Sequence, residues 1–239
     1  MSNELAYEAC LTKTQKILGL IEGNYRTVDI HREKGPKKIL ILGCIHSGTS
    51  LLTSLIGGHP NIGMLFEDLN NNEDKIYGKD FVGNKLILWH QIRYKQRANR
   101  VTHILNRVLN LFRKSQIKIF PSSRKSILDY VKEKAFIITI TRNESETRES
   151  MRKRMKWLKN ERLKEFYCEV VYRQSYKLID KISMSGYSNF MTIKLEDLRN
   201  EPEKVLKNIC RALGVVYDKR MLDGVNKNWR YSEYKGIQK

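Results

Sequence analysis

Residues 37–52 read KKILILGCIHSGTSLL, and this stretch decides the fold class. Its first part, Ile39 to Leu42, is a continuous apolar run bounded by two lysines and a glycine. A short run of this kind is typical of a strand that is buried on both faces, as in a parallel sheet. The second part is rich in glycine and hydroxyl side chains and leads into an apolar helical pattern at Leu51. The stretch therefore predicts a strand, a tight loop and a helix that begins near Gly48.

The same alternation continues along the chain. Two further apolar runs, residues 135–141 and 189–195, predict two more buried strands. Helical spacing of apolar residues predicts helices at 101–112, around 127–131, through 144–185 and over 202–213, where Gly214 is a suitable C-cap. Strands that alternate with helices predict a three-layer α/β/α fold with a central parallel sheet.

Composition limits the class of protein. The 239 residues are enough for one domain, and a hydrophobic share of 41% is enough to build its core. We expect a helical appendage over residues 1–36 and a main domain over 37–239. The chain shows no secretory signal and no apolar run of the roughly 20 residues needed to span a bilayer. Its four cysteines lie far apart, which predicts reduced thiols in a cytoplasmic protein and argues against a zinc site.

The net charge of +19 predicts an anionic partner, without choosing among nucleic acid, a membrane surface, an acidic polymer and a phosphorylated small molecule.

The loop after the first strand matches a phosphate-binding pattern. From Gly43 to Ser50 every defined position of GxxxxGK[ST] is present except the lysine, which is Thr49. Backbone N–H groups of residues 46–50 can still line a concave nest at the positive end of a helix. The ammonium group that reaches the β- and γ-phosphates of a triphosphate is missing. The loop is therefore predicted to hold a phosphate without being built for ATP or GTP; the alternative is a serine and glycine turn that caps an ordinary helix.

Three segments together resemble the sulfotransferases that use PAPS (3′-phosphoadenosine 5′-phosphosulfate). The segment from His46 to Leu52, followed by His59-Pro60, is similar to the family's 5′-phosphosulfate loop. Arg142 after a strand, with Ser150 eight residues later, is similar to its 3′-phosphate site. Residues 195–202, LEDLRNEP, are similar to its Y-E-D-L-x-x-x-P segment.

The resemblance implies a P-loop NTPase-like sulfotransferase fold, PAPS as co-substrate, PAP as product and no metal ion. It implies donor binding by His46, Ser47, Gly48, Thr49, Ser50, Arg142 and Ser150. His46 stands where the family has lysine or arginine, and histidine is only partly charged near pH 7. If His46 does this work, transfer is expected to be pH-sensitive or to need another cation.

The resemblance also implies the residues for the transfer chemistry. Many family members have a glutamate several residues after the His-Pro pair, and Glu67 matches that position as general base. Asp68 is the competing candidate, and a solvated acidic pair is the alternative for both. The lysine that stabilises transition-state charge is matched best by Lys85, with Lys118 as the other candidate; a lysine on a solvated face is the alternative for each. His46 completes the catalytic set.

Arg142 also has support that does not depend on the family. Its place at the carboxyl end of a predicted strand is where ligands of open α/β sheets bind. Arginine offers a planar fork for phosphate oxygens, and Ser150 would lie about two helical turns further on. The alternative is an arginine that caps the sheet edge and a serine on a helix surface.

The sequence thus predicts a metal-independent sulfotransferase that moves a sulfuryl group from PAPS to a hydroxyl or amine. The acceptor stays open: a sugar, a small phenol, a peptide tyrosine or another anionic molecule. A P-loop kinase or nucleotide hydrolase must explain the absent lysine, and a basic nucleic-acid-binding module finds no recognition motif here. The four histidines other than His46 have no metal-ligand partner at i+4.

Overall fold

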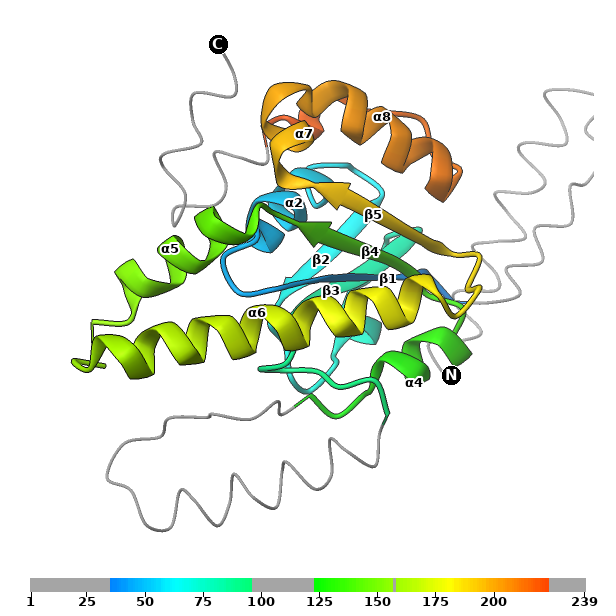
Figure 1. Cartoon of the computed structure of the whole chain (residues 1–239). Helices are drawn as coiled ribbons and strands as arrows, with labels where there is room; N and C mark the ends of the chain where they lie inside the picture. The colour runs from blue at the N-terminus through cyan, green and yellow to red at the C-terminus, as the bar shows by residue number, and fades with distance from the viewer. Residues whose placement is uncertain (1–34, 96–122, 157, 224–239) are drawn as a thin grey trace, which may run out of the picture. The chain divides into compact units, whose positions relative to one another are not determined.

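We describe the chain from a computed structural model over residues 35–95, 123–156 and 158–223 (Figure 1). The predicted appendage up to residue 34, the predicted helix at 101–112 and Lys118 lie outside these described residues.

A five-stranded parallel sheet forms the centre of the fold. Its strands are β1 (Lys37–Gly43), β2 (Ile62–Phe66), β3 (Phe81–Ile87), β4 (Phe136–Thr141) and β5 (Phe190–Lys194), and their order across the sheet is β2-β3-β1-β4-β5. Every pair is parallel, so all the carboxyl ends meet at one edge of the sheet. That edge is where an open α/β sheet binds its ligands.

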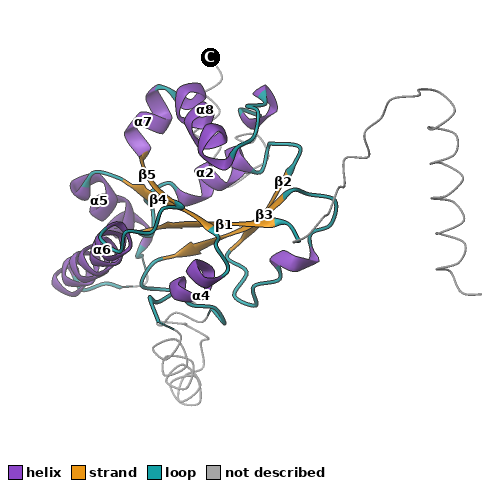
Figure 2. Cartoon of the chain, turned by 90° about the vertical axis from the view of Figure 1, so that its right-hand side faces the viewer, coloured by secondary structure: helices purple, strands orange, loops and turns teal. Residues whose placement is uncertain are grey.

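Helices cover both faces of this sheet. They are α2 (Thr49–Ile56), α4 (Ile127–Lys132), α5 (Glu144–Arg154), α6 (Glu161–Ser183), α7 (Leu195–Asn200) and α8 (Pro202–Leu213), with short 3₁₀ turns at Glu73–Lys75 and Lys219–Met221. Figure 2 shows α2, α7 and α8 on one side of the sheet and α4 on the other. The predicted three-layer α/β/α class with a central parallel sheet is confirmed.

The apolar run of β1 explains why the sheet is buried on both faces. Ile39 and Ile41 pack with α2 and α8 in one core cluster, whereas Leu40 and Leu42 pack with α4 and α6 in another. All four side chains are fully buried. Because consecutive side chains of a strand point to opposite faces, only a continuous apolar run satisfies both cores.

Most predicted elements are present with small changes at their ends. The runs at 37–43, 135–141 and 189–195 correspond to β1, β4 and β5, and α8 ends at Leu213 with Gly214, whose φ is 75°, as its C-cap. The helical region predicted through 144–185 is two helices, α5 and α6, because a new N-cap forms at Asn160, whose side chain accepts from the N–H of Leu163 at 3.1 Å.

The sequence did not predict β2 and β3. β3 contains Gly83, Asn84 and Lys85, polar or small residues that interrupt an apolar pattern, yet all its residues are buried. Lys85 therefore lies within the central sheet, between β2 and β1.

Candidate active site

The phosphate-binding pattern lies where the sequence predicts it, between β1 and α2 at the carboxyl edge of the sheet. Gly48, the N-cap of α2, has a left-handed backbone with φ of 96° and gives the helix no side-chain cap. The loop is closed by Ser47, whose N–H and Oγ both donate to the carbonyl oxygen of Cys44, at 3.1 and 2.7 Å. An uncapped helix N-terminus beside a tight loop offers backbone N–H donors to an anion.

Two glycines are required by this geometry. A Cβ atom at Gly43 would lie 2.5 Å from Ser47 Oγ and 2.9 Å from the carbonyl oxygen of Ile140. A Cβ atom at Gly48 would lie 2.6 Å from Leu195 Cδ1, and the positive φ disfavours other residues there. The glycines of the pattern thus let the loop pack against β4 and against the start of α7.

His46 occupies the loop with a left-handed backbone, at φ of 65°. Burial lowers its pKa to about 4, and the positive charges of Arg154 and Arg142 add to the effect. The imidazole is therefore neutral near pH 7 and can donate a hydrogen bond without supplying a charge. If His46 contacts the donor in this neutral form, the positive charge there must come from another residue.

Glu67 and Lys85 meet at the end of β2. The ammonium of Lys85, only 1% exposed, forms an ion pair with Glu67 Oε1, and the Glu67 side chain is 37% exposed. The N–H of Glu67 donates to the carbonyl oxygen of Lys85 at 2.8 Å, and the backbone of Glu67 is left-handed, at φ of 57°. The two residues that the sequence offers as base and charge stabiliser thus lie in contact, at the sheet edge that carries the phosphate loop.

Asp68, the competing base, is engaged differently. Its Oδ1 accepts from the N–H of Asn70 at 3.1 Å, and its Oδ2 accepts from the N–H of Asn72 at 2.6 Å. These backbone donors lower the pKa of Asp68 against the opposing effect of burial. The geometry makes Asp68 the residue that closes the turn after Glu67.

Arg142 follows β4 and reaches the phosphate loop. Its Nη1 donates to the carbonyl oxygen of His46 at 3.2 Å, while its Nε and Nη2 donate to Glu146 Oε2 at 3.1 and 2.9 Å. The hydroxyl of Tyr176, from α6, accepts from the backbone N–H of Arg142 and donates to its carbonyl oxygen. The strand end is therefore braced, and the guanidinium joins β4 to the loop after β1.

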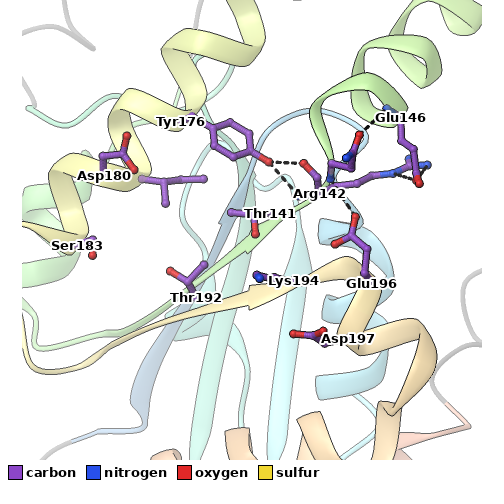
Figure 3. A pocket seen from close by; sticks show the side chains of 12 residues that line it. Thr141, Arg142, Glu146, Tyr176, Asp180, Ser183, Thr192, Lys194, Glu196 and Asp197 are labelled. Atoms are coloured by element: carbon purple, nitrogen blue, oxygen red, sulfur yellow. Dashed lines mark hydrogen bonds and ion pairs between the residues drawn. The ribbon is translucent and has the colours of Figure 1, made fainter.

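A pocket of about 730 Å³ opens beside Arg142, between α6 and the ends of β4 and β5. Figure 3 shows Arg142 and Tyr176 at one part of this pocket, with Glu196 and Asp197 nearby. Glu196 Oε1 accepts from the N–H of Asn143 at 2.9 Å, which ties the LEDL segment to the start of α5. Ser150 lies half-buried on α5, about two turns after the helix begins.

Sequence reasoning missed three residues that follow β3. Gln91 Nε2 donates to Glu67 Oε2 at 2.6 Å, and His90 Nε2 lies 2.6 Å from the hydroxyl of Tyr167 on α6. Trp89 has a left-handed backbone, and the guanidinium of Arg93 lies 3.5 Å from the centre of its ring. The signal was available only indirectly, because recognising β3 would have placed residues 88–91 at the functional edge of the sheet.

Comparison with known proteins gives the family. The chain matches the sequence profile of the sulfotransferase domain over residues 36–239. No curated protein sequence matches it significantly. Within the described residues, no helix has the length and apolar character that crossing a membrane requires.

Among solved structures, it is similar to the sulfotransferase domain of the curacin biosynthetic pathway, with 16% identity, 80% of this chain and 78% of that chain covered, and a TM-score of 0.46. The sulfotransferase domain of the Synechococcus PCC 7002 olefin synthase has 18% identity, coverage of 84% and 80%, and a TM-score of 0.46. Mouse sulfotransferase SULT7A1 complexed with PAP has 16% identity, coverage of 81% and 64%, and a TM-score of 0.49. The profile match extends over most of the chain. The chain therefore belongs to the sulfotransferase domain family and is a sulfotransferase.

Proposed function

We propose that the chain transfers a sulfuryl group from PAPS to a hydroxyl or amine of its acceptor and releases PAP, with Glu67 as general base. Family membership supports the reaction class, and the phosphate loop without a lysine supports a donor that is not a triphosphate. The observation that carries the proposal is the contact between Glu67 and the buried Lys85, at the edge of the sheet that also holds the loop.

The donor would be held at its two phosphate positions. The loop of His46, Ser47, Gly48, Thr49 and Ser50 would bind the 5′-phosphosulfate: Ser47 closes the loop through its bonds to Cys44, and the uncapped start of α2 presents N–H donors. Arg142 and Ser150 would bind the 3′-phosphate, since the guanidinium retains N–H donors beyond those bonded to Glu146 and His46.

The chemistry moves one proton and one sulfuryl group. The acceptor hydroxyl gives its proton to the Glu67 carboxylate as its oxygen attacks the sulfur. The bond between sulfur and the bridging oxygen breaks, and its electron pair stays on the 5′-phosphate of PAP. Lys85 would stabilise the charge that develops during transfer, while neutral His46 would donate a hydrogen bond to it. No step of this proposal requires a metal ion.

One titration tests the donor. Calorimetry of the full chain with PAP, with ATP and Mg²⁺, and with a short oligonucleotide is expected to give magnesium-independent binding of PAP alone. Binding of ATP with Mg²⁺ but not of PAP would favour a kinase or nucleotide hydrolase instead. Binding of the oligonucleotide alone would favour a nucleic-acid-binding module.

Arg142→Ala is expected to weaken PAP binding by about 1.5–3 kcal/mol, the contribution of a hydrogen bond to a charged group. Arg173→Ala is the matched control, because Arg173 is an exposed arginine on α6 paired with Glu169. The same calorimetric titration measures both variants. Equal PAP affinity in Arg142→Ala and wild type would remove Arg142 from the donor site.

Glu67→Gln is expected to abolish transfer and to leave PAP binding nearly intact, since the amide cannot take the acceptor's proton. Release of PAP from PAPS measures turnover, with water and a panel of sugars, phenols and tyrosine peptides as acceptors. Asp68→Asn is the control and is expected to retain turnover. Full turnover in Glu67→Gln would show that another base operates.

The acceptor, the location in the cell and the domain boundary stay predictions. We propose an anionic or carbohydrate acceptor, a cytoplasmic protein, and a helical appendage over residues 1–36 before the sulfotransferase domain. The net charge of +19 supports an anionic acceptor, and a screen of sulfated products with labelled PAPS tests it.

A further inference from the structure

The side chain of Gln91 bonds to the edge of β3 just beyond the point where its pairing with β2 ends. The register between β2 and β3 ends at Phe66 and Lys85, because Glu67 turns away with a left-handed backbone. Two residues further along β3, the N–H of Ile87 points to the side where β2 has ended. Gln91 Oε1 accepts from this N–H at 2.7 Å, and the N–H of Gln91 donates to the carbonyl oxygen of Ile87 at 2.9 Å.

This bond fixes which way the amide of Gln91 faces. A backbone N–H can only donate, so the oxygen of the amide must face Ile87. The amide nitrogen then faces Glu67 and donates to its Oε2 at 2.6 Å. Both neighbours thus require the same orientation of the amide, which makes Gln91 a rigid link between the backbone of β3 and the carboxylate.

The Glu67 carboxylate is consequently held at both oxygens. Lys85 donates to Oε1 and Gln91 donates to Oε2, and both donors come from β3 or the turn directly after it. Burial lowers the pKa of His90, in the same turn, and the charge of Glu67 opposes this effect. Asp68 is the adjacent acid, and its carboxylate faces the backbone of residues 70 and 72.

We propose that Gln91 is a positioning residue for the general base, a role that rests on the function proposed above. By holding Oε2, it fixes the plane of the Glu67 carboxylate relative to Lys85 and keeps the carboxylate ionised. It acts on proton transfer and not on donor binding, because among the described residues its side-chain amide bonds to Glu67 and to the N–H of Ile87 in β3.

Two variants separate positioning from a structural role. Gln91→Met keeps the length of the side chain and removes both hydrogen bonds. Gln91→Glu keeps an acceptor for the N–H of Ile87 and replaces the donor to Glu67 with a second carboxylate. Gln174→Met, at a half-buried position of α6, is the matched control. Unfolding of each variant is followed by circular dichroism.

The expected result is a fall in kcat for PAP release from PAPS of about 10- to 100-fold in Gln91→Met, the range for a misplaced catalytic group. The PAP dissociation constant and the KM for PAPS stay within about twofold of wild type. The acid limb of the pH profile of kcat/KM moves to higher pH, because one fewer donor stabilises the ionised carboxylate. In Gln91→Glu it moves further, by about one unit or more, since two adjacent carboxylates share a proton.

Wild-type kcat and an unmoved acid limb in folded Gln91→Met would overturn the role. The role would also be overturned if Gln91→Met lost activity only in proportion to the unfolded fraction, with the acid limb of the folded protein unchanged. If Gln91→Met does not fold, the acid limb of Gln91→Glu decides alone. Full turnover in Glu67→Gln, or no turnover in wild type, would contradict the proposed function and therefore also the role of Gln91. If Glu67→Gln is inactive while Gln91→Met behaves like wild type, only the role of Gln91 is contradicted.

Discussion

Unusual backbone conformations gather at one edge of this sheet. His46, Glu67 and Trp89 each have φ between 57° and 66°, and each lies within three residues of the end of β1, β2 or β3. For residues other than glycine this conformation costs on the order of 1 kcal/mol, so it persists where the surroundings require it. The sequence offered His46 and Glu67 through a motif and a spacing. It could not indicate their strain, which arises from tertiary packing.

The burial of His46 leads to a pH-dependent stability. Its pKa is about 4 in the folded chain and 6.5 in the unfolded reference, so below pH 6.5 the unfolded chain binds a proton that the folded chain does not. The free energy of unfolding is expected to fall between about pH 6.5 and pH 4, by up to about 3 kcal/mol from this group. Asparagine tolerates a positive φ, so His46→Asn removes the titrating group, and its pH-dependent contribution to stability, without straining the backbone.

Urea unfolding of wild type and His46→Asn across this pH range measures it. As the pH falls, the free energy of unfolding of wild type should decrease by more than that of His46→Asn. Parallel curves would show that His46 is not buried in the neutral form.

At the scale of elements, the sequence predicted best those strands and helices whose local pattern follows directly from burial or from capping. β1, β4 and β5 are buried strands with apolar runs, and α8 has both its proline start and its glycine end. β3 was missed because Asn84 and Lys85 are buried through specific partners: the Asn84 amide bonds to the backbone of Asp68, and Lys85 pairs with Glu67. Such partners are far apart in sequence, so no local pattern indicates them.

Gly43→Ala is expected to disturb the loop between β1 and α2. The added methyl group would meet Ser47, Thr49 and the backbone of Ile140 at less than 3 Å, and overpacking of this kind costs about 1–3 kcal/mol. PAP affinity should fall along with thermal stability. Gly35→Ala is the control, because nothing lies within 4 Å of the corresponding position. A Gly43→Ala variant with wild-type stability and PAP affinity would contradict the packing described here.

At the scale of the whole molecule, part of the positive charge along α5 is paired with carboxylates of α5 and α6. Arg148 pairs with Glu144 and Glu165, and Lys153 pairs with Glu149. Burial lowers the pKa of His46, and the positive charge of Arg154, at the end of α5, lowers it further. Composition gave the sign of the net charge, but which of these charges are paired depends on the fold.

This charge is expected to accelerate capture of an anionic donor. The association rate of PAP should fall several-fold between about 0.05 and 0.5 M salt, because screening shortens the reach of the protein's field. Stopped-flow binding measures the rate, and uncharged adenosine is the matched control, with little dependence on salt. A PAP association rate that does not change with salt would show that the charge serves another purpose.

The contact of Arg142 with the carbonyl oxygen of His46 has a consequence for how a donor is chosen. In the proposed binding mode it couples the segment that meets one phosphate to the segment that meets the other. PAPS is then a bivalent ligand: once one phosphate is seated, the second faces its site at a high effective concentration. Nucleotides with a single phosphate would lose this advantage entirely, so a site of this kind would select by the number and spacing of phosphates before any contact with the nucleobase.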